Sequence, residues 1–244
     1  MEDIEIIYED ADIVVVNKPS GLSVHRDEHI KAEIMTLADW HAARSPEAAQ
    51  VGEPLKLLSG TLARPGIVHR LDRETSGVMV LVKNDAAFAH VKAQFHDHLV
   101  TKEYRAFVYG HMKEAQGVID RPIARSAKDF RLRSAQRGGK GVARPALTEW
   151  ERITTNATHS YVRLMPKTGR THQLRVHLKA INHPIVCDKL YAPNQSCDFG
   201  FNRVALHAYS LTVVMLDGES RTFIAPLPEV FLAAEQIFAT GKTA

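Results

Sequence analysis

An acidic side chain enclosed by positive ones lies in the stretch VHRLDRETSG, residues 68–77. Arg70 stands two residues before Asp72, and Arg73 follows it directly. Positive groups within a few ångströms favour the charged form of an acid. An ionised carboxylate can act as a nucleophile and form a covalent intermediate. The same residues also fit a turn aspartate whose carboxylate is saturated by local hydrogen bonds, so this stretch alone leaves both interpretations open.

A second candidate is KTGRTHQLRVH, residues 167–177, which predicts a helix capped by Thr171. One face of this helix carries an apolar stripe formed by Leu174, Leu178 and Ile181. Arg175 lies beside the stripe, so we expect its guanidinium to be only partly exposed and to need a carboxylate partner.

Positive charge gathers at two further places. Lys167 and Arg170 precede the predicted helix, where cations oppose the helix dipole but help to hold phosphate. An amphipathic helix with solvated charges is the alternative, and the unfavourable placement favours a function. Residues 121–144 hold eight Lys or Arg against a single acid, Asp129, which indicates a solvated basic loop or a contact with a polyanion.

The sequence gives less support to a role for Tyr104, to a metal site or to a nucleotide cofactor. Tyr104, in TKEYRAF, is by default a packing residue of a strand. Of the 13 histidines, His25 and His29 are four apart but lack the HExxH order, so we expect no metal site. No phosphate-binding GxxxxGK loop and no GxGxxG motif occurs, so we expect no nucleotide cofactor.

The elements that must position these residues alternate between strand and helix. Apolar or alternating runs predict strands at residues 4–9, 12–17, 77–83, 102–110, 146–154 and 160–166. Asn84 is expected to cap a helix over residues 85–98, and Asp217-Gly218 is expected to turn a hairpin. Residues 43–60 and 135–141 are expected to be loops. Neighbouring strands without helical crossovers predict an α+β fold with a mixed, mostly antiparallel sheet, and no linker separates residues 1–244 into two cores.

Composition narrows the class of protein. The 244 residues are 45% hydrophobic and 24% charged, which is typical of a soluble globular protein, and the net charge is only +3. Two cysteines, Cys187 and Cys197, are too few for a disulfide framework and predict a reducing compartment. The acidic N-terminus lacks a signal-peptide pattern, and no apolar run could span a bilayer, so we expect a cytoplasmic protein that contacts no membrane.

Several motifs together are similar to one family. HRLDRETSGVMVLVKN resembles the signature of the RluA-type pseudouridine synthases, which isomerise uridine in ribosomal and transfer RNA. Further blocks resemble the family in its own order, namely VVVNKPSGLSVH, KEYRAFVYG, KTGRTHQLRVHL, HPIVCDKLY, LHAYSLT and FIAPLP. The resemblance runs from about Ile4 to Phe231. Cys187 stands where the family usually has glycine, and the resemblance indicates a short form without the S4 RNA-binding domain.

The resemblance implies roles for the candidate residues. Asp72 would be the nucleophile, attacking the ribose C1′ or the uracil C6 of the target uridine. Tyr104 would stack on the uracil and is a candidate to remove the C5 proton. Arg175 would pair with Asp72, Leu174 would line the pocket, and Arg70 would insert where the uridine left the stack.

The resemblance also implies a single pseudouridine-synthase catalytic domain with an active-site cleft across its sheet. Its partner would be structured RNA, ribosomal or transfer, held at phosphates by Lys167, Arg170 and residues 121–144. No cofactor or metal is expected, and nothing demands more than a monomer.

Two alternatives compete with this prediction. A non-catalytic RNA-binding protein of the same fold would have little use for Asp72 together with Tyr104 and Arg175. A hydrolase of small molecules would need a base that activates water near Asp72, and His69 would face the opposite side of an extended chain.

Overall fold

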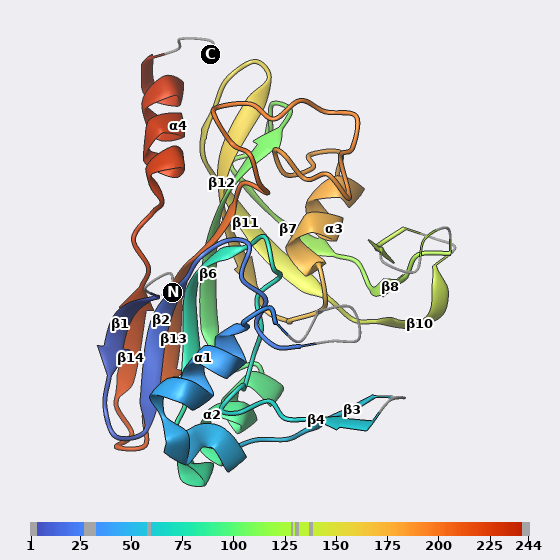
Figure 1. Cartoon of the computed structure of the whole chain (residues 1–244). Coiled ribbons are helices and arrows are strands. Elements are labelled where there is room, and N and C mark those ends of the chain that lie inside the picture. Colours follow the sequence, from blue (N-terminus) through green and yellow to red (C-terminus); the bar gives the residue numbers. More distant parts are fainter. Residues whose placement is uncertain are drawn as a thin grey trace. The chain divides into compact units, whose positions relative to one another are not determined.

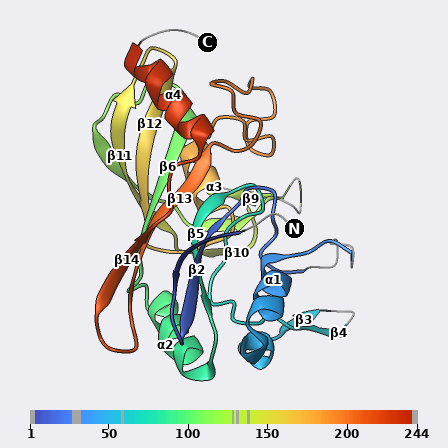
Figure 2. The ribbon, with the colours of Figure 1, turned by 60° about the vertical axis from the view of Figure 1, so that its left-hand side comes forward.

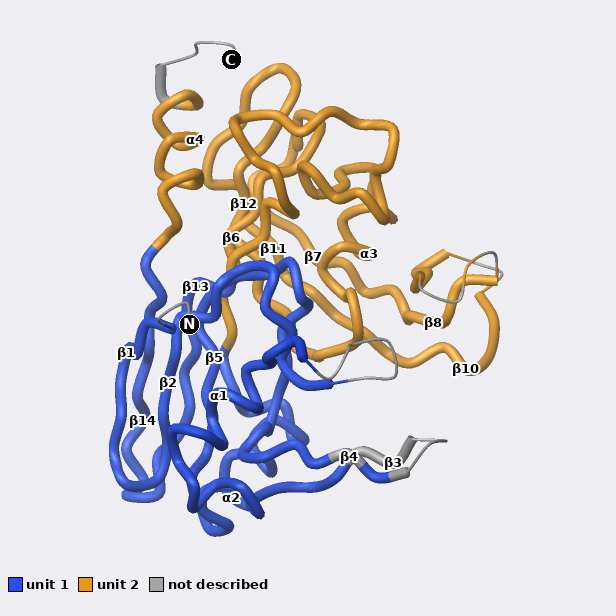
Figure 3. Tube along the Cα trace, in the orientation of Figure 1, with its two compact units in different colours: residues 1–101, 208–226 blue, residues 102–207, 227–244 orange. Residues whose placement is uncertain are grey.

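The computed structural model describes residues 4–26, 33–57, 60–127, 129, 132–136 and 139–240 (Figure 1). These residues gather into two units (Figure 3). Unit 1 comprises residues 1–101 and 208–226, and unit 2 comprises residues 102–207 and 227–244. The chain crosses from unit 1 to unit 2 after Thr101, at the start of strand β6, and returns after His207, inside strand β13. Neither of these two crossings is therefore a linker. That one catalytic domain covers residues 1–244 stays a prediction.

Unit 1 is built around a β-sheet. Strands β1 (Glu5–Glu9), β2 (Ile13–Lys18), β5 (Ser76–Val82) and β13 (Leu206–Val214) follow one another in it, and β14 (Ser220–Ile224) pairs with β13. Every residue of β5 is buried, which explains its unbroken apolar sequence. Strand β3 (Leu55–Leu57) pairs antiparallel with β4 (Gly60–Leu62) in a separate small sheet.

Two helices cover this sheet. Figure 2 shows α1 (Leu37–Arg44) and α2 (Asp85–His96) on opposite sides of β2 and β5. Thr36 and Asp39 form a capping box at the start of α1, and Asn84 caps α2 by accepting a hydrogen bond from the amide of Ala87 at 2.9 Å. Burial on both faces makes the β2–β5 pair a rigid base for the loop that precedes β5.

Unit 2 contains a second run of antiparallel strands. Their order is β6 (Thr101–Tyr109), β12 (His159–Pro166), β11 (Leu147–Thr155) and β7 (Gln116–Asp120). A separate small sheet joins β10 (Lys140–Arg144), β8 (Ile123–Arg125) and β9 (Arg133–Ser134). Two helices complete the unit, α3 (Gln173–Ala180) and α4 (Glu229–Thr240).

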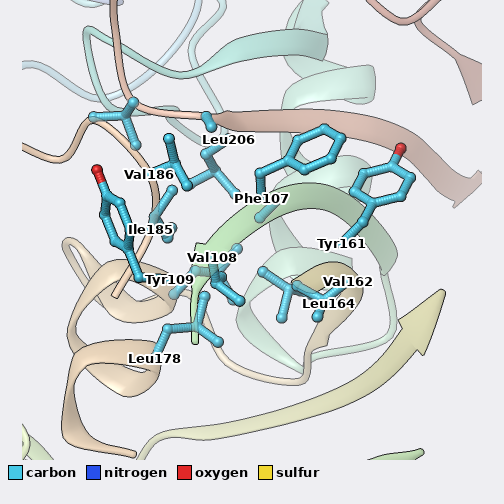
Figure 4. Close-up of a cluster of buried hydrophobic side chains, with 14 of the residues drawn as sticks. Phe107, Val108, Tyr109, Tyr161, Val162, Leu164, Leu178, Ile185, Val186 and Leu206 are labelled. Carbon is cyan, nitrogen blue, oxygen red and sulfur yellow. The ribbon is translucent and has the colours of Figure 1, made fainter. Parts of the chain in front are cut away.

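The core of unit 2 centres on Phe107 of β6 (Figure 4). Its ring stacks on Tyr161 of β12 with centroids 4.3 Å apart, and Phe231 of α4 lies at 5.7 Å. Leu174 and Leu178 bring α3 into the same cluster. Each large apolar side chain that is fully buried contributes roughly 1.5–3 kcal/mol, so this cluster fixes α3 against the strands.

The predicted fold class is confirmed. The pairings β1–β2, β2–β5 and β13–β14 in unit 1 and β6–β12, β12–β11 and β11–β7 in unit 2 are antiparallel, and within the described residues four α-helices accompany the strands. The predicted cap at Thr171 is wrong, because the helix begins at Gln173 after His172, whose φ is 57°. The predicted loop over residues 43–60 is also wrong in part. It contains the end of α1, a 3-10 helix at Pro46–Gln50 and β3.

The expectation of reduced cysteines fails in this structure, where Cys187 and Cys197 form a disulfide. Cys187 has a φ of 59°, a left-handed conformation that glycine adopts without strain. This conformation explains why glycine is the usual residue there in the family that the chain resembles. Within the described residues, no helix is both long enough and apolar enough to cross a membrane.

Candidate active site

The loop that carries Asp72 is tied to the turn after β2. The carbonyl of Arg73 accepts hydrogen bonds from the Gly21 amide at 2.8 Å and from Lys18 Nζ at 3.2 Å. In return, Arg73 Nε donates to the Gly21 carbonyl at 2.9 Å. The Thr75 amide donates to the Asp72 carbonyl at 3.0 Å, which closes a turn around the acid. The position of Asp72 is therefore set by backbone contacts on both sides of it.

Lys18 is a fully buried cation at the centre of these contacts. Besides the Arg73 carbonyl, its ammonium donates to the carbonyls of Pro19 and Leu22, at 2.8 Å each. A buried charge is costly unless hydrogen bonds compensate it, and this ammonium makes all three that it can donate. The lysine thus joins the turn after β2 to the residue that follows Asp72.

His69 fixes the other end of the loop. Its Nε2 accepts a hydrogen bond from the amide of Val80 in β5 at 3.0 Å, and its ring stacks on Phe95 of α2 with centroids 4.4 Å apart. An imidazole nitrogen that accepts from an amide cannot carry a proton. His69 is therefore a structural anchor in this state, which weakens the hydrolase alternative that would use it as a base.

Asp72 is flanked in the sequence by Arg70 and Arg73. Asp72 itself is half-buried, whereas Arg70 and Arg73 are exposed. Burial lowers the pKa of Arg64, and the nearby charge of Arg70 lowers it further. Arg64 thus lies near Arg70, and the charge of the Glu53 carboxylate acts on the pKa of Arg64 in the opposite direction.

Glycine is required where the loop enters β5. Gly77 has a φ of 120°, and a Cβ there would overlap the carbonyl of Ala208 and lie 2.6 Å from its nitrogen. Only a residue without a side chain lets β5 and β13 approach so closely.

Tyr104 lies on β6 of unit 2. It is opposite Leu164 of β12, is half-buried, and packs against the core cluster. Lys102, two residues before it, donates to the carbonyl of Thr168 at 3.4 Å. Burial, with a smaller contribution from Lys167, lowers the pKa of Lys102 to about 8. The lysine therefore stays mostly protonated at neutral pH beside the loop that precedes α3.

Arg175 is almost fully buried on α3, more so than the partial exposure that its position in the sequence predicts, and it has the expected carboxylate partner. The described partner is Asp188, which accepts from Arg175 Nε at 2.8 Å and from Nη2 at 2.7 Å. The guanidinium carbon also lies 5.1 Å from the centre of the Tyr191 ring. That Arg175 pairs with Asp72 stays a prediction.

Sequence reasoning did not assign a role to Asp188 or Tyr191. Both lie in the block HPIVCDKLY. The sequence contains one indication that Asp188 is the carboxylate partner of Arg175. An arginine expected to be partly buried needs a carboxylate, and Asp188 follows the apolar run IVC that predicts burial.

The predicted phosphate contacts also lie in unit 2. Lys167 is about half exposed and pairs with Glu149 at 2.8 Å, and Arg170 Nε donates to the Pro145 carbonyl at 3.1 Å. Arg170 lines a pocket with four basic side chains of the small sheet, namely Arg125, Arg133, Lys140 and Arg144. None of the described residues that line this pocket is acidic. The fold thus brings Arg170 together with part of the basic segment 121–144; residues 128, 130, 131, 137 and 138 of that segment lie outside the described residues.

The remaining candidates are Leu174 and the histidines considered as metal ligands. Leu174 is buried in the core of unit 2, and its contact with a substrate stays a prediction. Within the described part of the chain, no three His, Cys, Asp or Glu side chains are grouped as metal ligands would be. His29, half of the His25 and His29 pair, lies outside that part.

The chain is similar to proteins that act on RNA. A family model described as RNA pseudouridylate synthase matches residues 12–180. An uncharacterised RNA pseudouridine synthase of Synechocystis is 35% identical over 93% of this chain and 67% of its own length. Ribosomal large subunit pseudouridine synthase D of Zymomonas mobilis is 35% identical over 93% of this chain and 70% of its own.

A solved structure has the same fold. Human RNA Pseudouridylate Synthase Domain Containing 1 superimposes with a TM-score of 0.74 at 28% identity, covering 95% of this chain and 88% of that one. Its similarity in structure agrees with the match in sequence over most of the chain. From the motifs, the fold and these relatives together, the chain belongs to the RNA pseudouridylate synthase family and is an isomerase that acts on RNA.

Proposed function

We propose that the chain converts specific uridines of structured RNA into pseudouridine, with Asp72 as the nucleophile. The observation that carries this proposal is the loop of Asp72. Its neighbours are held by the buried ammonium of Lys18 on one side and by the ring of His69 on the other. A carboxylate that must meet one atom of a substrate needs such a rigid support.

The reaction balances without an oxidant or a reductant. The bond between C1′ and N1 of the uridine breaks, and a bond between C1′ and C5 forms. C5 loses a proton and N1 ends with one, so the product is an isomer. Asp72 would bond covalently to C1′ or C6 in between and then be released.

The other proposed roles follow the chemistry of each side chain. Tyr104 would stack on the uracil and take part in removal of the C5 proton. Arg175 would hold the negative charge at the reacting centre, and Leu174 would line the apolar side of the pocket. Arg70, which is exposed, would stack on the bases left when the uridine is extruded.

The basic pocket of unit 2 supports binding of an RNA backbone. Five positive side chains without a described acid among them fit several phosphates better than one small anion. Each phosphate that they neutralise would release counterions, so affinity would fall steeply with salt. Lys167 would join these contacts once its pairing with Glu149 is exchanged for a phosphate.

The proposed substrate is large-subunit ribosomal RNA. The relatives from Zymomonas mobilis and Borreliella burgdorferi are named ribosomal large subunit pseudouridine synthase D, at 35% identity each. Transfer RNA is the second candidate substrate. We further propose a monomer that works in the cytoplasm and needs no metal, to be tested by sedimentation, by cell fractionation and by assays with a chelator.

The experiment compares Asp72→Asn with the parent protein on ribosomal and transfer RNA, with pseudouridine mapped at single nucleotides. Asp72→Asn keeps the shape of the side chain, so we expect isomerisation to be abolished and RNA affinity to stay within about twofold. Asp85→Asn, an exposed change in the same unit, is the control and should keep full activity. Retained turnover in Asp72→Asn would refute the nucleophile, and lost binding would point to misfolding of the loop.

The RNA target is tested separately in cells that lack this gene. A missing pseudouridine in large-subunit ribosomal RNA would support the proposed substrate. If sites were missing only in transfer RNA, the ribosomal substrate would be wrong while the reaction would stand.

A further inference from the structure

The guanidinium of Arg175 is hydrogen-bonded to a fully buried carboxylate, that of Asp188. Asp188 is completely inaccessible and accepts hydrogen bonds from two nitrogens of the guanidinium, at 2.8 and 2.7 Å. Its Oδ1 also accepts from the amides of Leu190 and Tyr191, at 3.1 Å each. With donors from three residues around it, the carboxylate cannot turn away from Arg175.

The ring of Tyr191 fixes the face of the same guanidinium. The ring is buried in a small cluster with Val176 of α3, and Arg175 lies 5.1 Å from its centre. The hydroxyl accepts from the Arg133 amide at 2.9 Å and lies 2.8 Å from His172 Nδ1. The ring is thus held at both its face and its tip, and a cation over such a face is attracted to it.

Stability alone does not explain this arrangement. A buried ion pair costs desolvation that its attraction only partly returns, and apolar replacements of such pairs are often equally stable. What two parallel N–H···O bonds do supply is geometry, because they set the plane and the rotation of the guanidinium. These bonds use Nε and Nη2, so the directions of the other N–H groups of Arg175 are fixed as well.

We propose that Asp188 and Tyr191 are positioning residues that hold the guanidinium of Arg175 in one orientation for the isomerisation. The inference rests on the proposed function, since it assumes that Arg175 takes part in the chemistry. Neither residue touches the substrate. Their effect on the rate passes through Arg175.

The first test needs no activity. Hydrogen exchange of the Arg175 Nε–H group is followed by nuclear magnetic resonance in nitrogen-15-labelled protein, with Arg175→Lys used to assign the signal. In Asp188→Asn we expect exchange at least about tenfold faster than in the parent protein, because one charge-assisted acceptor is lost. Asp198→Asn is the matched control. Asp198 lies ten residues after Asp188 and pairs with His159, not with Arg175, so this change should leave the Arg175 signal unchanged.

The second test measures turnover of ribosomal RNA by Asp188→Asn, Arg175→Lys and the double variant. A misplaced catalytic group commonly costs about 100-fold in rate, so we expect kcat to fall about 10- to 100-fold in each single variant while KM changes less than about threefold. If Asp188 acts only through Arg175, the double variant is no slower than Arg175→Lys. Asp188→Glu, which restores a carboxylate, should recover part of the rate.

Each outcome decides the inference. Unchanged kcat in folded Asp188→Asn, additive losses in the double variant, or unchanged exchange at Arg175 would overturn it. If Asp188→Asn does not fold, Tyr191→Leu takes its place, since it removes the ring under the guanidinium and keeps the carboxylate. Faster exchange at Arg175 together with full turnover in Asp72→Asn would keep the anchoring of Arg175 and overturn the proposed function.

Discussion

Gly77→Ala tests whether close backbone approach fixes the loop that carries Asp72. The added Cβ would overlap the Ala208 carbonyl, and the backbone φ of 120° is one that a residue with a side chain rarely adopts. Strain of this kind costs about 1–3 kcal/mol, and overpacking against atoms that cannot rotate away costs about 1–3 kcal/mol more. We expect a loss of about 4 kcal/mol in the free energy of unfolding.

Two other glycines separate the cost of backbone strain from the cost of overpacking. Gly21 has a φ of 88° but nothing within 4 Å of a built Cβ, so Gly21→Ala should cost only the strain, about 1–2 kcal/mol. Gly169 has neither a positive φ nor a neighbour within 4 Å. Gly169→Ala should therefore change stability by no more than about 0.5 kcal/mol.

The assay is unfolding in urea followed by tryptophan fluorescence. The chain has two tryptophans, Trp40 on α1 of unit 1 and Trp150 on β11 of unit 2. In a Trp150→Phe background the signal comes from unit 1, where Gly77 and Gly21 lie; Gly169 lies in unit 2 and is followed through Trp150 in a Trp40→Phe background. The loss expected for Gly77→Ala corresponds to a fall in melting temperature of roughly 8–16 °C for a chain of this size. If Gly77→Ala costs no more than Gly21→Ala, the close approach to Ala208 does not constrain the loop and the reasoning is wrong.

Three further predictions concern acid, reduction and salt. Burial lowers the pKa of His41 and of His177, so as the pH falls through about 6.5 both bind fewer protons in the folded protein than in the unfolded chain. Stability should therefore fall as the pH drops below about 6.5, by up to about 1.4 kcal/mol per pH unit for each histidine, and equal urea midpoints at pH 7.5 and 5.5 would contradict this. Reduction of the disulfide between Cys187 and Cys197 should lower the free energy of unfolding by roughly 2–3 kcal/mol, which is measured as a lower melting temperature in dithiothreitol. An unchanged melting temperature after both thiols have been shown to be reduced would contradict a stabilising role of the disulfide. Arg170→Gln should reduce the slope of log affinity for RNA against log salt by about 1, and an unchanged slope would remove Arg170 from the phosphate contacts.

The sequence by itself determined the local elements and the family. Asn84 caps its helix as the sequence predicts, and Gly218 turns the hairpin with a φ of 85°. These two signals lie within a few residues of the structure that they specify, whereas the local signals for a cap at Thr171 and for a loop over residues 43–60 were overridden by the rest of the structure. Short ordered motifs identified the family for the same reason, because residues that must serve one chemistry keep their type and spacing.

Tertiary structure decided the contacts between distant residues. The partner described for Arg175 is Asp188, 13 residues away, and the buried Lys18 reaches the carbonyl of Arg73, 55 residues away. The disulfide likewise depends on a loop that brings Cys197 back to Cys187. Local sequence signals indicate at most that Arg175 needs a buried carboxylate; they do not select the Arg73 carbonyl for Lys18 or the pairing of the two cysteines. Packing chooses them, because burying a charge or ordering a loop becomes favourable only when the whole surrounding structure is in place.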